Sequence, residues 1–236
     1  MRRTARLIAP LLCLVAPAAG LAQAYQCRIP PKVSVPQVRP DGPSRPLAVT
    51  GYTLALSWSP EYCKGREAAA AQRFQCSGSS GTFGFVVHGL WPESRGNSWP
   101  QWCATRREPT PATIRRNLCT VPSAALIARQ WAKHGACMTR RPETYFNITR
   151  ILYDSLAWPD FDALSHKPDL TAGDVRSLFA AANKGWSEAA VGVKLNERGW
   201  LQELRLCYDR RFRPKACDRR RFGAGNEQAA KIWRGL

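Results

Sequence analysis

The sequence lacks several features that define common classes of protein site. It has no CxxC pair and no cluster of cysteine and histidine at metal-ligand spacing, which argues against a bound metal. No internal repeat is present, so the chain is not a tandem-repeat protein. Beyond the N-terminal region no run approaches about 18 consecutive apolar residues, the length needed to span a bilayer. Only three histidines occur, and two of them, His88 and His134, each stand directly before a glycine and three residues from a tryptophan.

The first 24 residues have the composition of a secretory signal peptide. A start with three arginines precedes an apolar segment over residues 7–15, and AQA at 22–24 has the small-x-small form of a cleavage site. The apolar segment is too short to cross a bilayer. We therefore expect cleavage after Ala24 and a periplasmic or secreted protein without stable membrane association.

Removal of this segment leaves an even number of cysteines, eight of the original nine. An even number in an exported chain indicates disulfides. Spacing alone does not determine the pairs, although Cys63 and Cys76 are close in sequence, as are Cys207 and Cys217.

Basic residues outnumber acidic ones, with 35 Lys and Arg against 17 Asp and Glu and a formal net charge of +18. This excess favours a polyanionic partner and a salt-sensitive encounter with it. Charge alone does not distinguish RNA, DNA, an anionic lipid surface or a solvated basic face without a specific partner. A membrane-active cationic protein is the weakest of these, because no strongly amphipathic cationic helix is present. Residues 219–221, all arginine, are interpreted as an exposed run that adds to the attraction for RNA.

The chain divides into an N-terminal arm and one domain. Six prolines within residues 25–50 predict an extended arm, and residues 51–236 form the domain. Three β-prone segments predict strands at residues 52–58, 82–87 and 200–208. Helical patterns cover residues 123–134, 143–157 and 171–182. We expect an α+β fold in which helices pack on a central, antiparallel sheet and disulfides stabilise a single domain.

The segment RQWAKHGAC at 129–137 places three polar groups together. On a helix, Gln130, Lys133 and His134 stand at i, i+3 and i+4 and project from one face. An isolated helical histidine is usually structural. An amide, an ammonium and an imidazole on one face form a cluster that a core would satisfy only at a cost, which favours a functional role.

The segment FVVHGLWPE at 85–93 holds the second histidine of this kind. His88 follows an apolar strand and is expected where that strand emerges, and Gly89 lets another group approach the backbone closely. Trp91 offers a flat ring on which a base can stack, and ordinary core packing is the alternative. The remaining histidine, His166, is interpreted as a surface residue.

Two imidazoles and a lysine are suited to an internal transfer of the phosphoryl group at an RNA phosphodiester bond. One neutral histidine takes the proton of a ribose 2′-OH, and one protonated histidine gives a proton to the leaving 5′-oxygen. Lys133 would stabilise charge on the phosphorane oxygens. This chemistry needs no metal.

The two histidine segments also resemble the two active-site segments of the T-two ribonucleases, which are secreted cyclising endoribonucleases. HGLWP at 88–92 matches nearly completely, and the second segment keeps W-x-K-H-G-x-C. Similarity extends over LALSWSPEYC and over the GW…CYDRRFRPKAC region, and so over most of the chain.

The resemblance implies an α+β fold, an RNA substrate, a 2′,3′-cyclic phosphate intermediate and no cofactor. We further expect broad base specificity and a monomer. It assigns the acid/base pair to His88 and His134, transition-state stabilisation to Lys133, and part of a base site to Trp91. It also suggests a Cys103–Cys137 disulfide, which leaves Cys27 to pair with Cys119.

The chain departs from the family where Arg129-Gln130 replaces the usual His-Glu. Gln130 can donate a hydrogen bond to a phosphate oxygen or orient His134, but it cannot carry charge. Arg129 either takes over phosphate binding or is a solvated helix residue. The alternative to an active enzyme is therefore a weakened or inactive RNA-binding paralogue.

Overall fold

The computed structural model describes residues 26–235, so the predicted cleavage after Ala24 lies outside the described residues. Within this range the strands form one antiparallel sheet in the order β2-β1-β4-β3. Their bounds are β1 (Gly51–Trp58), β2 (Phe85–Glu93), β3 (Val191–Leu195) and β4 (Leu201–Asp209). The predicted strands at 52–58 and 200–208 correspond closely to β1 and β4. The strand predicted at 82–87 begins later and continues to Glu93, and β3 was not predicted.

The helices predicted at 123–134, 143–157 and 171–182 correspond to α4 (Ala124–Lys133), α5 (Pro142–Asp154) and α7 (Ala172–Ala182). The described residues form the helices α1 (Ser59–Cys63), α2 (Arg73–Cys76), α3 (Pro111–Asn117), α4 (Ala124–Lys133), α5 (Pro142–Asp154), α6 (Phe161–Ser165), α7 (Ala172–Ala182) and α8 (Arg219–Phe222). Three short 3-10 helices are η1 (Ala70–Gln72), η2 (Gly135–Cys137) and η3 (Glu188–Ala190). Thr171 and Asp174 form a capping box that starts α7. No helix among the described residues is long and apolar enough to cross a membrane.

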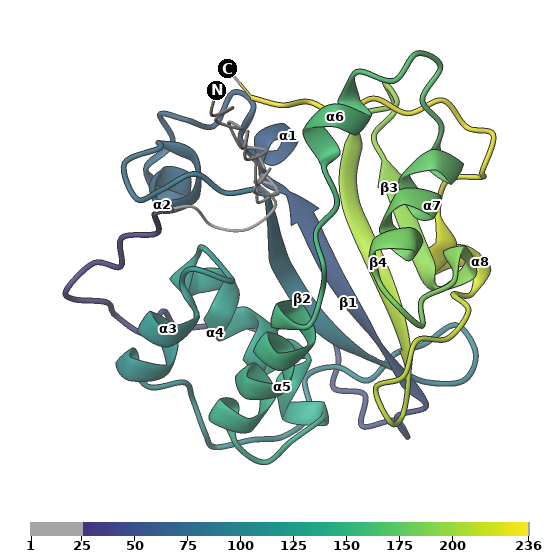
Figure 1. Cartoon of the computed structure of the whole chain (residues 1–236). Helices are drawn as coiled ribbons and strands as arrows, with labels where there is room; N and C mark the ends of the chain where they lie inside the picture. Colours follow the sequence, from purple (N-terminus) through teal and green to yellow (C-terminus); the bar gives the residue numbers. More distant parts are fainter. Residues whose placement is uncertain (1–25, 236) are drawn as a thin grey trace, which may run out of the picture.

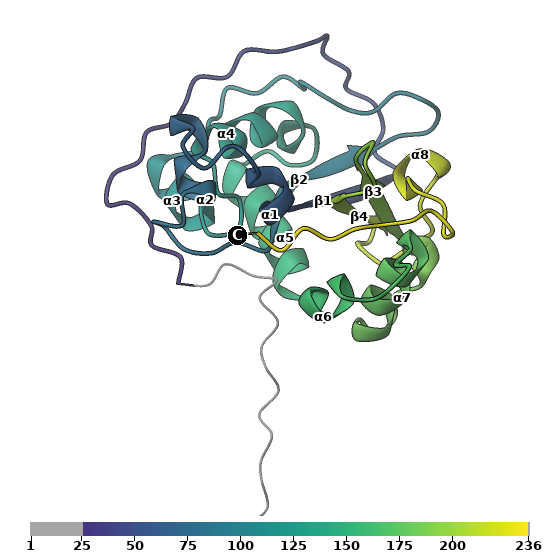
Figure 2. The same cartoon turned by 90° about the horizontal axis from the view of Figure 1, so that it is seen from above.

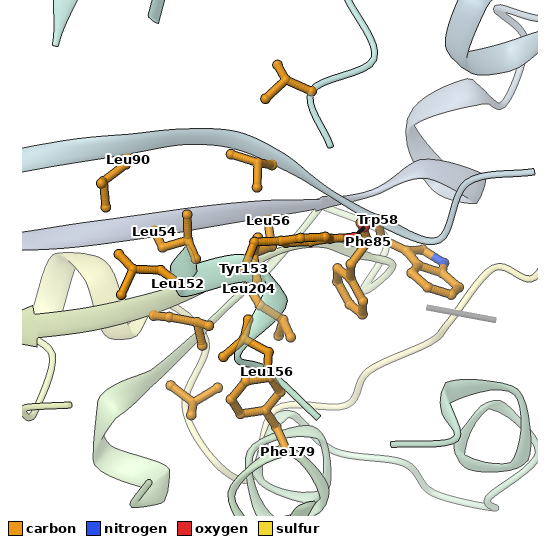
Figure 3. Packing of buried hydrophobic residues seen from close by; sticks show 14 of the residues in the cluster. Leu54, Leu56, Trp58, Phe85, Leu90, Leu152, Tyr153, Leu156, Phe179 and Leu204 are labelled. Carbon is orange, nitrogen blue, oxygen red and sulfur yellow. Dashed lines mark hydrogen bonds between the residues drawn. The ribbon is translucent and has the colours of Figure 1, made fainter. Parts of the chain in front are cut away.

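Helices cover the sheet in two groups, one at each edge. Helices α4 and α5 contact β2, whereas α7 and α8 contact β3 (Figure 1). Alternate residues of the central strands point into the core between the sheet and helices α5 and α7. Figure 3 shows Leu54, Leu56 and Leu204 from the strands packing with Leu152 of α5 and Phe179 of α7. The expected α+β fold with a central antiparallel sheet is therefore confirmed.

Both outer strands are tied to other parts of the chain through their backbone groups. At β2, the Tyr145 hydroxyl donates to the Leu90 carbonyl at 3.0 Å, and the Tyr153 hydroxyl donates to the Phe85 carbonyl at 2.7 Å. At β3, the fully buried Arg176 donates from Nε to the Val191 carbonyl at 2.9 Å. The backbone groups of these strands thus find partners outside the sheet, as buried backbone must.

Four disulfides connect the segments: Cys27–Cys119, Cys63–Cys76, Cys103–Cys137 and Cys207–Cys217. These are the pairs expected from sequence proximity and from the resemblance. The Cys103–Cys137 bond joins the loop before α3 to η2, directly after α4. It therefore holds the residues that follow the histidine of the second segment.

The N-terminal arm has no helix or extended strand over residues 26–50. It passes around the outside of α3 and α4 before it enters β1 (Figure 2). The arm is attached at Cys27 by its disulfide and near its other end by an antiparallel bridge between Arg45 and Gln101.

Candidate active site

His88 lies inside β2, at a β-bulge, and not at the end of a strand as expected. Ala55 of β1 pairs with Gly89 and Leu56 pairs with Val87, so His88 has no partner in β1. Strand β2 also contains Pro92. An outer strand tolerates proline because one side of its backbone does not pair within the sheet. A bulge bends the strand and re-aims one side chain, here the imidazole.

The ring of His88 is held by a buried carboxylate. His88 Nδ1 lies 2.8 Å from Glu203 Oε2, and Arg205 Nε donates to Glu203 Oε1 at 2.8 Å. Glu203 and Arg205 alternate along β4 with the buried Leu204 and Leu206, so they face away from the core. The candidate site therefore lies on the sheet face opposite the core.

Glu203 is ionised despite its burial. Desolvation raises the pKa of this carboxyl, but the hydrogen bond and charge of His88 and the Arg205 guanidinium outweigh it, and the pKa is lowered overall. An ionised carboxylate only accepts hydrogen bonds. Nδ1 of His88 is therefore the protonated nitrogen, and Nε2 is the nitrogen left to exchange a proton.

The second segment forms the last turn of α4 and its C-cap. Ser123 caps the helix start by accepting from the Leu126 backbone at 3.2 Å. Helix α4 ends at Lys133, and His134 follows as the C-cap. Gln130 and His134 are 5% and 7% exposed, so both are buried against the sheet side of the helix. The predicted polar face is present.

Gln130 contacts Trp91 with its side chain, through a hydrogen bond from Trp91 Nε1 to Gln130 Oε1 at 3.0 Å. The amide thus fixes the indole, which differs from the expected bond to His134 or to phosphate. Gly89 makes room for this contact, because a Cβ there would lie 2.0 Å from Gln130 Oε1 and 2.5 Å from Trp91 Nε1.

Trp91 contacts both imidazoles. Its ring centroid lies 5.1 Å from that of His88, edge to face, and 5.9 Å from that of His134, in a tilted arrangement. The indole is half-buried. The two histidines, 46 positions apart in the chain, therefore stand at one indole.

His134 is neutral in the free protein. Burial is the largest cause that lowers the pKa of His134 to about 3, and the charges of Lys133, His88 and Arg129 lower it further, while Asp41 raises it. His134 Nδ1 is buried and has no hydrogen-bond partner in the described structure. A neutral imidazole can accept a proton.

Two hollows adjoin the histidines. The first has a volume of about 330 Å³ and is lined by Trp91, Pro92, Glu93, Trp99, Lys133, His134, Arg205, Arg220 and Arg221. The second, of about 610 Å³, reaches His88 and Glu203 and contains the cationic residues Lys64, Arg66, Lys194 and Arg198. Each imidazole thus opens onto a hollow with several positive charges, which suits a polyanion.

The cations of α4 contact a carboxylate from the arm. Lys133 Nζ lies 3.0 Å from each carboxylate oxygen of Asp41, and the Arg129 guanidinium also pairs with it. Trp102 Nε1 donates to Asp41 Oδ1 at 3.0 Å. Arg129 is therefore paired with a carboxylate and is not a freely solvated residue.

Glu203 and Asp41 were missed in the sequence analysis, because neither lies in a motif. Glu203 meets His88 across 115 positions, and Asp41 meets Lys133 across 92. The interpretation of residues 219–221 as an exposed arginine run is wrong for Arg221. Arg221 keeps just 14% of its side chain exposed and pairs with Glu93 and Asp218, so it is not a free surface charge. Among the described residues no three metal-ligating side chains come together.

The fold and the site define a disulfide-linked α+β protein with two imidazoles at one indole and a lysine in the adjoining hollow. The Ribonuclease T2 family model matches residues 50–217. The chain therefore belongs to the Ribonuclease T2 family.

Two bacterial relatives are similar in sequence. A probable ribonuclease of Haemophilus influenzae is 27% identical over 187 residues, which cover 75% of this chain and 64% of that protein. A ribonuclease of Aeromonas hydrophila is 42% identical over 86 residues, 36% of each protein. The matches thus span less than two thirds of the length of either relative.

Solved structures show the same fold. Trichomaglin, described as an S-like ribonuclease, superposes with a TM-score of 0.56 at 22% identity, covering 72% of this chain and 92% of that one. RNase NT, solved in complex with 5′-AMP, also gives a TM-score of 0.56, at 17% identity, with 78% and 98% coverage.

Proposed function

We propose that this protein is an endoribonuclease that cleaves single-stranded RNA through a 2′,3′-cyclic phosphate, without a metal and with broad base specificity. The observation that carries the proposal is the contact of His88 and His134 with the one indole of Trp91. Lys133 borders the same hollow as His134. Membership of the Ribonuclease T2 family supports the same reaction class.

His134 is the general base of the first step in this proposal. Its lowered pKa, about 3, keeps the ring neutral before RNA binds. A bound phosphate would bring negative charge beside the cations Lys133 and Arg129, which lower that pKa in the free protein. The ring can then accept the proton of the ribose 2′-OH.

His88 is the general acid. Glu203 fixes the ring with Nδ1 protonated, which leaves Nε2–H of the imidazolium to donate a proton to the leaving oxygen. The bond from O2′ to phosphorus forms as the bond from phosphorus to O5′ breaks, and one proton enters His134 while another leaves His88. In the second step water opens the cyclic phosphate and the two histidines exchange roles.

Lys133 and Arg129 bind the phosphate in this proposal. Both are cations on the last turns of α4, and Lys133 lines the first hollow. Charge-assisted hydrogen bonds to a developing phosphorane are stronger than bonds between neutral groups. Gln130 contributes indirectly, since it fixes the Trp91 ring.

Broad base specificity follows from stacking. Trp91 and Trp99 both line the first hollow, and every base has a face that stacks on an aromatic ring. The complex of RNase NT with 5′-AMP supports nucleotide binding by this fold.

The test compares RNA cleavage by the wild-type protein with cleavage by two variants, His88→Ala and His134→Ala. Each protein is incubated with single-stranded RNA in excess EDTA. We expect the wild type to yield products that end in 2′,3′-cyclic phosphate, and each variant to lose at least ~10²-fold in kcat. His166→Ala is the matched control, because this exposed imidazole contacts Arg234 and is expected to leave turnover unchanged. Equal cleavage of DNA would exclude attack by the 2′-OH. Wild-type binding of RNA without turnover would favour the inactive RNA-binding paralogue.

We also propose that the protein is exported to the periplasm or medium and acts as a monomer. The four disulfides support export, because such bonds persist in oxidising compartments. N-terminal sequencing of the exported protein should begin at Tyr25, and light scattering should give a mass below the 26.3 kDa of the full chain.

A further inference from the structure

The arm brings an acidic group to the predicted phosphate site. Asp41 lies outside residues 50–217, the part that matches the family model. Its carboxylate accepts hydrogen bonds from Lys133 Nζ at 3.0 Å and from the Arg129 guanidinium. The neighbouring amide on α4, Gln130, bonds Trp91 and carries no charge. Asp41 is thus the acidic group that contacts these two cations.

The arm next to Asp41 is held by several contacts. Gln101 Nε2 donates to the Pro43 carbonyl at 3.0 Å. Arg45 and Gln101 exchange backbone hydrogen bonds of 2.8 and 3.1 Å, and the Arg45 guanidinium lies 4.9 Å from the ring centroid of Trp99. Trp99 itself lines the first hollow. The carboxylate is therefore presented by a segment that is attached to the wall of the site.

Trp102 connects this carboxylate to α4. Its indole donates to Asp41 at 3.0 Å, and its backbone N–H donates to the Lys133 carbonyl at 2.8 Å. The side-chain charges of Lys133 and Arg129 each lie 5.7 Å from the Trp102 ring centroid. Only 8% of Trp102 is exposed, so the ring is a fixed support for the carboxylate and for both cations.

The carboxylate also offsets a repulsion. Arg129 and Lys133 stand at i and i+4 on α4, where like charges destabilise a helix and push the two side chains apart. The hydrogen bond from Lys133 is the first of the causes that lower the pKa of Asp41 to about 2, so Asp41 is ionised at any working pH. One negative charge then holds two flexible cations together.

We propose that Asp41 is a positioning residue whose carboxylate holds Lys133 and Arg129 in place to bind the scissile phosphate. This inference rests on the proposed ribonuclease function. The competing role is a counter-ion that blocks the site until RNA displaces it. The attachment of the arm through Gln101 and the hydrogen bond from Trp102 favour the positioning role, because they make the Asp41 carboxylate a permanent part of the site.

Asp41 also influences His134 through charge. Lys133 and Arg129 on α4 and His88 on β2 lower the pKa of His134, whereas Asp41 on the arm raises it. Removing the carboxylate charge therefore lowers this pKa further. A base must be deprotonated to act, so the acid limb of the pH–rate profile should move to lower pH in Asp41→Asn.

The experiment compares the full chain with Asp41→Asn and Asp41→Glu in the RNA-cleavage assay over a pH series. We expect Asp41→Asn to lose about tenfold in kcat, with KM changed less, because the amide keeps the shape but no longer holds both cations. Asp41→Glu should recover part of the loss. Asp162→Asn is the matched control, since it removes the same charge at a distant position. Asp162 is 69% exposed and lies 3.8 Å from Arg234.

A rise in kcat/KM for Asp41→Asn, with a fall in KM, would overturn the positioning role and establish the blocking one. Unchanged kcat with an unshifted acid limb would also overturn it. Trp102→Phe, which removes the indole donor and keeps a smaller aromatic ring, gives a second measurement. The loss of kcat in Trp102→Phe and the loss in Asp41→Asn should be less than additive in the double variant. If the wild type does not turn over RNA, the proposed function fails. If it does, and Asp41→Asn matches it, only this inference fails.

Discussion

Replacing Glu203 by glutamine would remove the charge that orients His88 while keeping the shape of the side chain. The carboxylate makes two hydrogen bonds of 2.8 Å, one with His88 Nδ1 and one with Arg205 Nε. Each bond of this charge-assisted kind contributes about 1.5–3 kcal/mol. An amide can offer its oxygen to only one of the two partners, so one of the bonds is lost.

The size of the effect depends on which partner keeps the oxygen. If Arg205 keeps it, the amide N–H₂ faces His88 Nδ1 and stabilises the tautomer that has the proton on the wrong nitrogen. A comparable change at the aspartate of the serine-protease triad lowers kcat by ~10⁴. If His88 keeps it, the tautomer is preserved while the charge and the bond from Arg205 are lost, and about tenfold is expected. We therefore expect kcat for RNA cleavage to fall between about 10-fold and ~10⁴-fold.

The assay measures single-turnover cleavage of RNA in EDTA across pH, together with thermal unfolding. Glu61→Gln is the matched control, since Glu61 is also a buried carboxylate on the second hollow, bonded to Asn196 at 2.8 Å and not to a histidine. The folded pKa of Glu203 is lowered, so its ionic contribution to stability is present above the unfolded pKa and is lost as pH falls through the folded pKa. Activity of a folded Glu203→Gln within twofold of the wild type would refute the orienting role.

The remaining predictions concern the indole and the buried imidazole. Gly89→Ala places a Cβ 2.0 Å from Gln130 Oε1, so the hydrogen bond between Gln130 and Trp91 should break. We expect kcat to fall by about tenfold or more and indole fluorescence to report a more exposed Trp91. Unchanged fluorescence and an unchanged rate would contradict this expectation. The pKa of His134 falls from 6.5 to about 3 on folding, so protonation of the unfolded chain should remove stability as pH drops from 6.5 towards 3, by up to about 1.4 kcal/mol per pH unit. Denaturant titrations should show a shallower acid decline in His134→Gln, and equal slopes would refute the burial of a neutral imidazole.

Local signals predicted the regular elements well. Helix α4 was marked by Ser123 and by Gly135, and α7 by the cap at Thr171, because caps and stops are encoded within a few residues. The strand β3 was missed since VGVKL is short and lies near turn residues. The bulge at His88 was also missed, because a register shift depends on the partner strand and has no signal in β2 alone.

The residues of the candidate site also divide into those that local sequence signals predicted and those that only the tertiary structure brings in. His88, Lys133 and His134 stand in two short segments whose residue types already suggested the chemistry. Glu203 and Asp41 could not be found, because they approach the site only when β4 and the arm take their places in the tertiary structure. A carboxylate in a strand or in a proline-rich arm is, by its sequence alone, an ordinary polar residue.

The two outer strands of the sheet also bear on association between molecules. A strand with vacant backbone groups invites a second chain to extend the sheet, which is a common route to aggregates. Between residues 26 and 235, groups at Phe85 and Leu90 are occupied by tyrosine hydroxyls, and the Val191 carbonyl is occupied by Arg176. An incoming strand would have to displace these partners at either side. Extension of the sheet by a second copy is therefore opposed at these positions, and the net charge of +18 also opposes contact between copies.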